Sequence, residues 1–449
     1  MPEPAGTGAE PAPPGQGPSV ARGSAPLFWA QVAGNAGLLA ALVPITRELG
    51  PAGRGTLAFI TVTAIVAATL SRLGVTDATT VFAAQRPQLR PVLLANVMLA
   101  VTVSATAAAA IVCGALLLPA LRPPGLGDVE LAVMALAMLA SALADAGYMF
   151  VLGCSRFRFH ALVTIATAWL YAATVTVVAL SAGLTVVRAA LIWVAFQALK
   201  ALVLLWASVR AEGLGAPSGR LLAESVAFGL RAWIGSLSSA FNERVDQILV
   251  ALLASEAVLG IYAAAVNGFE ILLYLASAAA TAILPLVARG GAEGRADRVV
   301  AAFRSVALVT AGGIAVAAVL GPLLLPLAFG SAFEASAAPF LWLLPGALGF
   351  VAMAIFSNAL LASSAPGRSS VGPLVSLVLG VILDLLLIPP LGATGAALAA
   401  SAALITGGGT ALAIYRLRDT FPARALVVPR RGDLDMLRTL ARPFTRERS

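Results

Sequence analysis

Long apolar segments separated by short polar turns make up most of this chain. From Pro26 onward we count twelve such segments, each longer than the roughly 20 residues that a helix needs to cross a bilayer. They cover residues 26–48, 55–84, 90–120, 129–152, 159–182, 187–209, 222–253, 257–288, 299–328, 336–363, 369–389 and 391–416. The ten-residue alternation typical of a membrane β-barrel does not occur in the sequence. The pattern therefore predicts an all-α polytopic membrane protein with about twelve transmembrane helices.

Two neighbouring segments carry polar residues at helical spacing. At about 100° per residue, Arg231, Asn242 and Asp246 fall on one face of segment 222–253. Segment 257–288 has a second polar face, made of Asn267, Glu270, Tyr274, Ser277 and Thr281. A charge facing lipid costs roughly 2.5–3.5 kcal/mol on insertion scales, so such faces usually turn toward water or a partner. We therefore expect these two helices to line a water-filled cavity.

The segments divide into two sets of six. Residues 26–210 form the predicted N-terminal lobe, residues 222–416 form the C-terminal lobe, and the polar residues 211–221 link them. Residues 1–25 are rich in proline, glycine and alanine, which predicts a disordered tail. Residues 417–449 form a basic tail. Transporters built from two such repeats place their substrate near the membrane midplane between the halves, so we expect a central cavity there.

The first turn of each predicted lobe contains a short internal repeat. Residues 51–58 read PAGRGTLA, and residues 256–263 read EAVLGIYA. At one constant offset, the repeat matches Ala52, Gly55 and Ala58 with Ala257, Gly260 and Ala263. Because the two turns occupy corresponding positions, the repeat supports two six-helix units of the same orientation.

The composition agrees with a membrane protein and limits the chemistry. The chain is 60% hydrophobic and 11% charged, with a mean hydropathy of +0.94. Its two cysteines, Cys113 and Cys154, lie in or beside apolar segments and form no disulfide framework. The only histidine is His160. We therefore predict no metal site, no cofactor and no catalytic residue.

The distribution of the 29 basic residues predicts the orientation of the chain. If the N-terminus is inside the cell, 21 basic residues fall in inside connections and tails, and four fall outside. This asymmetry places both termini in the cytoplasm and the protein in the cell inner membrane. The spread over many loops is not a nucleic-acid-binding pattern, so no nucleic acid is expected. Nine arginines between Arg416 and Arg448 predict binding of the C-terminal tail to anionic lipid, and leave docking of polysaccharide-assembly proteins open.

Several short motifs occur in an order that resembles a known family. They are Leu49–Thr56 (LGPAGRGT), Asn242–Leu249 (NERVDQIL), Leu259–Ala264, Ile283–Pro285, Phe329–Phe333, Leu344–Gly346, Leu387–Pro389 and Leu391–Ala397. Together they resemble the polysaccharide-biosynthesis (Wzx-type) flippases, which share a superfamily with lipid II flippases and multidrug exporters. The resemblance covers nearly all of residues 26–416 and implies two six-helix lobes that alternate access. It implies a polyprenyl-diphosphate-linked oligosaccharide as substrate. Asp384 stands where many relatives would carry asparagine, and its role stays open.

The polar residues within the segments are candidates for binding such a substrate. A diphosphate favours cations, arginine above all, and sugars favour amides, hydroxyls and aromatic faces. The substrate-binding candidates are Gln31, Asn35, Arg72, Lys200, Arg231, Asn242 and Arg244. Each of the four cations could instead have a purely structural role. Arg244 could pair with a neighbouring helix, Arg231 could reach the membrane surface, Lys200 could pair with Asp145, and Arg72 could pair locally. For Arg244 and Arg72 the pairing is the favoured interpretation.

Three carboxylates are candidates for ion coupling: Asp145, Asp246 and Glu270. A carboxylate in a partly dry site can exchange a proton or bind a cation. A permanent ion pair with Arg244 or Arg231 is an equally good explanation for the last two. The sequence leaves both interpretations open.

Three other functions are alternatives to the flipping of a lipid-linked saccharide. A cation-coupled multidrug exporter should have an acidic and aromatic cavity, whereas four basic residues lie within the segments of this chain. A lipid II flippase would share the fold. A membrane glycosyltransferase or polymerase needs acid–base or metal-binding groups, commonly on a sizeable loop, and the predicted outside loops here are short.

Overall fold

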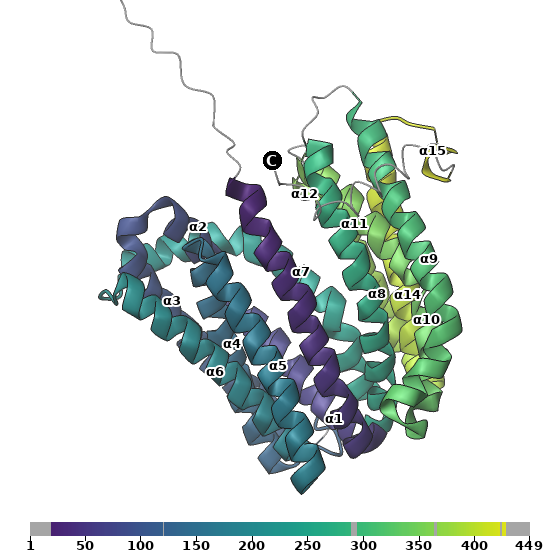
Figure 1. Ribbon diagram of the computed structural model, residues 1–449, viewed down its shortest axis with the longest axis horizontal. Coiled ribbons are helices and arrows are strands. Elements are labelled where there is room, and N and C mark those ends of the chain that lie inside the picture. The colour runs from purple at the N-terminus through teal and green to yellow at the C-terminus, as the bar shows by residue number, and fades with distance from the viewer. Residues whose placement is uncertain (1–18, 120, 289–293, 363–365, 423, 428–449) are drawn as a thin grey trace, which may run out of the picture.

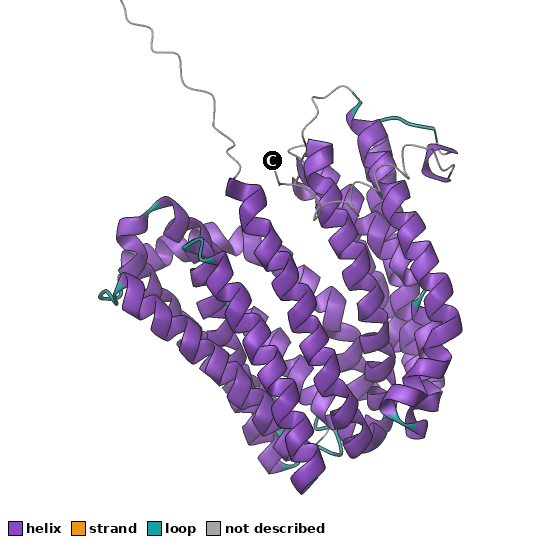
Figure 2. Cartoon of the chain, in the orientation of Figure 1, coloured by secondary structure: helices purple, strands orange, loops and turns teal. Residues whose placement is uncertain are grey.

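The computed structural model describes residues 19–119, 121–288, 294–362, 366–422 and 424–427. For some helical residues, Arg231 among them, it describes the backbone and not the side chain. Within this described part the chain is built from helices joined by short loops, with no strand (Figure 2). The all-α fold predicted from the sequence is confirmed.

Helix length and composition agree with about twelve membrane spans. In the described residues, nine helices are long and apolar enough to cross a membrane, or ten when the bent pair 331–343 and 346–361 counts as one span. One of the nine is a double span, because the first helix changes direction at Gly50, where φ is +62°. Large apolar side chains cover the outer surfaces of these helices, for example Leu180 at 84% exposure and Ile111 at 72%. Surfaces of this kind are suited to lipid.

The helices form two lobes. The N-terminal lobe contains α1 (Ser19–Ser71), α2 (Val75–Gln85), η1 (Pro87–Leu89), α3 (Arg90–Leu116), α4 (Asp128–Gly153), α5 (Phe157–Ala182) and α6 (Val186–Glu212). The C-terminal lobe contains α7 (Gly219–Leu253), α8 (Glu256–Ala288), α9 (Arg295–Phe329), η2 (Ser331–Ser336), α10 (Ala337–Leu343), α11 (Gly346–Ala362), α12 (Pro366–Ser369), α13 (Val371–Leu391), α14 (Ala393–Arg418) and α15 (Arg424–Val427). In Figure 1 the N-terminal lobe lies on the left and helices α8, α9, α11 and α14 lie on the right.

Helix α1 begins at Ser19, so the predicted disordered tail over 1–25 is wrong for residues 19–25. The helix continues upstream through Pro26, which lacks the N–H that would bond to the Arg22 carbonyl, so its first turns form without that hydrogen bond. Residues 1–18 lie outside the described part of the chain.

The connection between the lobes is shorter than the predicted linker 211–221. Helix α6 continues to Glu212 and α7 begins at Gly219, because Gly213 with φ +80° ends the first helix and Ser218 caps the second. The connection is also fastened to the N-terminal lobe. The Asn96 side chain of α3 donates to the Ser218 carbonyl at 3.1 Å and accepts from the Ser218 N–H at 2.8 Å.

Part of the predicted tail 417–449 folds back onto the C-terminal lobe. Helix α14 continues to Arg418, and α15 packs beside α9, where an Nη of Arg304 donates to the Ala425 carbonyl at 2.6 Å. Residues 428–449, which hold most of the tail's arginines, lie outside the described part. Binding of this tail to anionic lipid therefore stays a prediction.

The lobes meet at the end of the molecule that contains Gly50, called here the Gly50 end. Figure 1 shows the lobes in contact at the bottom and diverging toward the top, where the described ends of the chain lie. At the Gly50 end one hydrophobic core runs through both lobes and includes Ile60, Tyr262 and Phe333. Arg47 of α1 adds a polar tie, because its Nε donates to the Ala328 carbonyl of α9 at 2.8 Å.

Candidate functional site

The central cavity lies between the lobes and is lined by both. It is a hollow of about 950 Å³, part of it open to solvent, with walls from α1, α5, α6, α7 and α8. Its polar residues are Asn35, Arg54, Thr61, Tyr171, Trp193, Arg244, Gln247, Asn267, Glu270 and Tyr274. Of the two polar helix faces identified in the sequence, the one on α8 contributes to this wall through Asn267, Glu270 and Tyr274. The predicted face on α7 does not, because Asn242 and Asp246 line a different cavity, and α7 contributes Arg244 and Gln247 instead. The predicted central cavity is therefore confirmed.

Arg54 lies between the predicted segments 26–48 and 55–84, so it is one of the four basic residues predicted to be outside, and this prediction is wrong. The structure places Arg54 in the second half of α1, with only 8% of the residue exposed. The kink at Gly50 turns the chain back into the membrane, and Pro51 directly after it suits the first turn of a helix. Gly50 followed by Pro51 was thus the signal that could have placed Arg54 inside a span.

Arg54 has no ion-pair partner among the described residues, and the carboxylate that acts on it electrostatically, that of Glu270, is paired with Arg244. The Nε of Arg54 is buried without a hydrogen-bond partner in the described structure, and no ion pair or hydrogen bond to its guanidinium occurs there. A buried guanidinium normally has an anion or several acceptors around it, because an unpaired charge away from water is costly. This side chain is therefore suited to an anionic ligand in the cavity.

Arg244 of α7 forms an ion pair with Glu270 of α8. The Nη1–Oε1 distance is 2.7 Å, and the two side chains are 21% and 20% exposed. The favoured prediction, that Arg244 pairs with a neighbouring helix, is confirmed. The pair still lines the central cavity, so both groups can contact a ligand there.

A second cavity, of about 1,240 Å³, lies within the C-terminal lobe and adjoins the first through Arg244, Glu270 and Tyr274. Asp246 lies in its wall and accepts a hydrogen bond from the Tyr262 hydroxyl at 2.5 Å. Asp384 of α13 lines the same cavity, is only 2% exposed, and its Oδ1 has no hydrogen-bond partner in the described structure. Four carboxylates line this cavity, those of Glu243, Asp246, Glu270 and Asp384, and among the described residues only Glu270 forms an ion pair with an arginine or lysine.

Asn242 also belongs to the second cavity and not to the central one. Its amide donates to the Pro373 carbonyl of α13 at 3.2 Å and accepts from the Ser376 hydroxyl at 3.2 Å. These contacts tie α7 to α13. Asn242 therefore has a packing partner that explains its polarity without a substrate.

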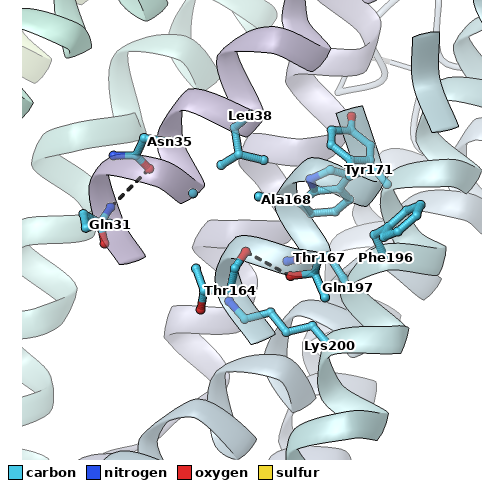
Figure 3. A pocket seen from close by; sticks show the side chains of 12 residues that line it. Gln31, Asn35, Leu38, Thr164, Thr167, Ala168, Tyr171, Phe196, Gln197 and Lys200 are labelled. Atoms are coloured by element: carbon cyan, nitrogen blue, oxygen red, sulfur yellow. Dashed lines mark hydrogen bonds between the residues drawn. The ribbon is translucent and has the colours of Figure 1, made fainter. Parts of the chain in front are cut away.

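A third pocket, of about 530 Å³, is lined by α1, α5 and α6 of the N-terminal lobe. Gln31 and Asn35, one helical turn apart, are joined by a hydrogen bond of 3.2 Å. Figure 3 shows the Lys200 side chain extending across the pocket wall toward Thr164. The structure thus brings together Gln31, Asn35 and Lys200, three of the residues singled out in the sequence.

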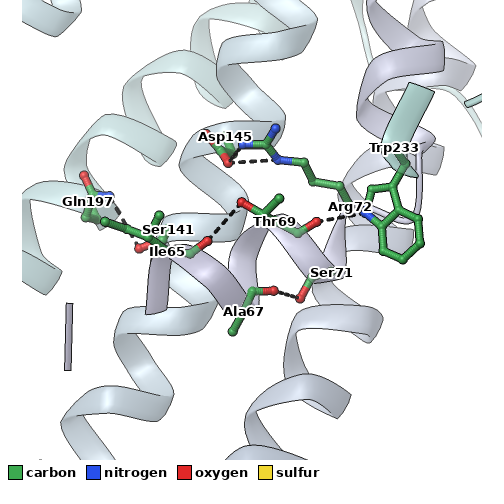
Figure 4. A network of polar contacts seen from close by, with 9 residues as sticks. All are labelled: Ile65, Ala67, Thr69, Ser71, Arg72, Ser141, Asp145, Gln197 and Trp233. Carbon is green, nitrogen blue, oxygen red and sulfur yellow. Dashed lines mark hydrogen bonds and ion pairs between the residues drawn. The ribbon is translucent and has the colours of Figure 1, made fainter. Parts of the chain in front are cut away.

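Arg72 and Asp145 pair with each other inside the N-terminal lobe. Arg72 follows the last residue of α1, and its Nε donates to the Asp145 carboxylate of α4 at 3.1 Å (Figure 4). Neither residue lines the three cavities described above. Asp145 therefore pairs with Arg72 and not with Lys200. The side chain of Arg231 lies outside the described residues.

Comparison with known proteins identifies the family. The model of the polysaccharide biosynthesis protein family matches residues 20–290, which is more than half of the chain. The chain belongs to this family. No curated protein sequence gives a significant match to this member of the polysaccharide biosynthesis protein family.

Solved structures resemble this family member in fold at low sequence identity. The lipid II flippase MurJ in an inward closed conformation superposes with a TM-score of 0.74 at 12% identity, over 95% of this chain and 94% of that one. An inward-facing multidrug resistance MATE family transporter gives 0.63 at 12% identity, over 88% and 98%. A transporter of the MOP superfamily from Pyrococcus furiosus gives 0.54 at 15% identity, over 89% and 95%. The fold is therefore that of these two-lobed transporters.

Proposed function

We propose that this protein moves a polyprenyl-diphosphate-linked oligosaccharide from the inner to the outer leaflet of the cell membrane, for assembly of a cell-surface polysaccharide. The observation that carries the proposal is Arg54, a buried arginine that has no ion pair within the described part of the chain and lies in the wall of a cavity between two lobes. Membership of the polysaccharide biosynthesis protein family and the fold shared with a lipid II flippase support the same conclusion.

The cavity chemistry fits the head of such a lipid. A diphosphate presents oxygens that the planar fork of a guanidinium can bind in bidentate fashion, and Arg54 and Arg244 both face the cavity. A multidrug exporter that selects cations would gain nothing from an uncompensated arginine there, because like charges repel. The lipid tail would stay in the bilayer while the head crosses between the lobes.

The orientation follows from the charge distribution of the chain. With the described chain ends in the cytoplasm, the inside connections and tails carry most of the basic residues, as the positive-inside rule requires. The central cavity is then closed on the outside by the contacts at the Gly50 end. Alternating access requires these contacts to open and the lobes to close at the other end. Residues 26–210 and 222–416 would move as two units around the short connection.

The test is transport by purified protein in liposomes, with a fluorescent polyprenyl-diphosphate disaccharide as probe. We expect Arg54→Gln to lower the translocation rate at least about tenfold, equivalent to about 1.4 kcal/mol. Arg54→Lys should retain part of the rate, because it keeps the charge and loses the fork.

Arg188→Gln is the matched control, because Arg188 is an exposed arginine whose guanidinium donates to the Ala182 and Gly183 carbonyls at the end of α5. It should transport at the wild-type rate. Full transport by Arg54→Gln, or equal loss in Arg188→Gln, would overturn the role given to Arg54. No transport of the probe by the wild type would overturn the function.

We propose that the second cavity couples transport to a proton or another monovalent cation through Asp246 and Asp384. The ion pair of Glu270 and the ion pair of Asp145 make these two carboxylates poorer candidates than the sequence indicated. Asp384→Asn should make the transport rate independent of an imposed cation gradient, with Glu334→Gln as the control on an exposed carboxylate of η2. An unchanged gradient dependence in Asp384→Asn would remove it from coupling.

A further inference from the structure

The pocket in the N-terminal lobe continues from the central cavity. Asn35, Tyr171 and Trp193 line both hollows, so a ligand bound near Arg54 can extend into this pocket without leaving the protein. The two hollows differ in chemistry. The pocket contains no arginine, and its single charged residue is Lys200.

Lys200 is a cation near the middle of α6, half-buried and without an ion pair or hydrogen bond in the described structure. Asp145 acts on it electrostatically, but the Asp145 carboxylate is bound by Arg72. A lysine at membrane depth is costly unless it faces water or an anion. Lys200 therefore faces the pocket without an ion-pair partner among the described residues, and its ammonium is available to an anionic group of a ligand there.

The other walls of the pocket are those of a carbohydrate site. Tyr171, Trp193 and Phe196 provide aromatic faces, and the amides of Gln31, Asn35 and Gln197 and the hydroxyls of Thr164 and Thr167 provide donors and acceptors. Amides and hydroxyls satisfy the neutral hydroxyls of a sugar. They leave the ammonium of Lys200 to recognise a negative group on the same sugar.

We propose that this pocket binds an acidic, carboxylate-bearing sugar of the glycan head, with Lys200 as the residue that selects the acid. The inference rests on the proposed function, in which Arg54 and the nearby cavity hold the diphosphate. The substrate has one diphosphate, which the proposed function places at Arg54, so Lys200 in the adjoining pocket is left for a second anionic group. A carboxylate on the sugar provides it beside the aromatic and amide groups that bind the ring.

The experiment compares two lipids that differ only in this group, in liposomes containing the full chain. The probes are a polyprenyl-diphosphate disaccharide ending in glucuronic acid and its counterpart ending in glucose. We expect the wild type to prefer the acidic lipid. Lys200→Met should lower the rate for the acidic lipid about tenfold and leave the neutral lipid within about twofold, a difference of roughly 1 kcal/mol.

Three variants control for folding and for charge. Lys200→Arg should keep the preference for the acidic lipid, because it keeps the positive charge. Arg210→Gln removes a positive charge from an exposed position on the same helix and should change neither rate. Gln197→Glu keeps Lys200 and adds a carboxylate to the pocket wall, so it should lower the acidic rate alone.

The outcomes separate this inference from the proposed function. If Lys200→Met lowers both rates equally, or neither, while the wild type transports, the acidic-sugar pocket is overturned and the flippase stands. If Lys200→Met does not fold, a rate for the acidic lipid in Gln197→Glu that stays at the wild-type value overturns the pocket in the same way. If the wild type transports neither lipid, the proposed function fails and this inference fails with it.

Discussion

Charged side chains inside the membrane part fall into paired and unpaired groups. Arg72 pairs with Asp145, and Arg244 pairs with Glu270. Arg54, by contrast, has no ion pair or hydrogen bond in the described structure. Removing one partner of an ion pair leaves the other charge uncompensated, whereas neutralising an unpaired arginine removes a buried charge that is itself unfavourable. The two groups should therefore respond in opposite ways to neutral substitutions.

Arg72→Leu should destabilise the protein by about 1–3 kcal/mol, because it leaves the Asp145 carboxylate unpaired and partly buried. The double variant Arg72→Leu with Asp145→Leu should recover most of this loss, since no charge remains. Thermal unfolding in detergent measures both. A double variant as unstable as the single one would show that the pair contributes through packing and not through charge compensation.

Residue roles could be predicted from the sequence only in part. The spacing of Glu270 and Asp246 placed both in a cavity wall, because helix periodicity follows directly from the chain. The partner of Asp145 could not be predicted, since it depends on how α4 packs against the end of α1. The place of Arg54 in the cavity wall was not predicted, because a loop between two spans and the first turn of a buried helix have similar composition.

At the level of elements, the repeated turns of the two lobes pack against each other. Gly55 of α1 lies against the Glu256 carbonyl, and Gly260 of α8 lies against the Pro51 carbonyl. A Cβ at either glycine would overlap the opposing backbone. The sequence repeat thus predicted equivalent turns, and the structure adds that each glycine allows close approach to the first residue of the other turn.

Gly55→Leu should separate the lobes at the Gly50 end, because backbone atoms cannot yield as a flexible side chain can. A cysteine placed at Thr61 in the central cavity should then react faster with a membrane-impermeant thiol reagent added from outside. Gly114→Leu is the matched control, since nothing lies within 4 Å of a Cβ at Gly114 in α3. Equal labelling of the two variants would show that this contact does not close the cavity.

At the level of the whole molecule, the sequence predicted the number and order of helices better than their ends. Apolar segments longer than 20 residues specify spans with little ambiguity. Ends depend on local backbone geometry, as at Ser19 and in the connection after Gly213. The arrangement of three adjoining cavities depends on helix packing, which periodicity alone does not specify.

We propose that this polysaccharide biosynthesis family member carries a diphosphate-linked saccharide through the cavity at Arg54. The most direct measurement is deletion of the gene, followed by identification of the saccharide lipids that accumulate on the inner leaflet. We predict accumulation of one polyprenyl-diphosphate-linked oligosaccharide, which the wild-type gene clears and the Arg54→Gln gene does not. Unchanged inner-leaflet lipids after deletion, or full clearance by Arg54→Gln at normal protein levels, would contradict the account.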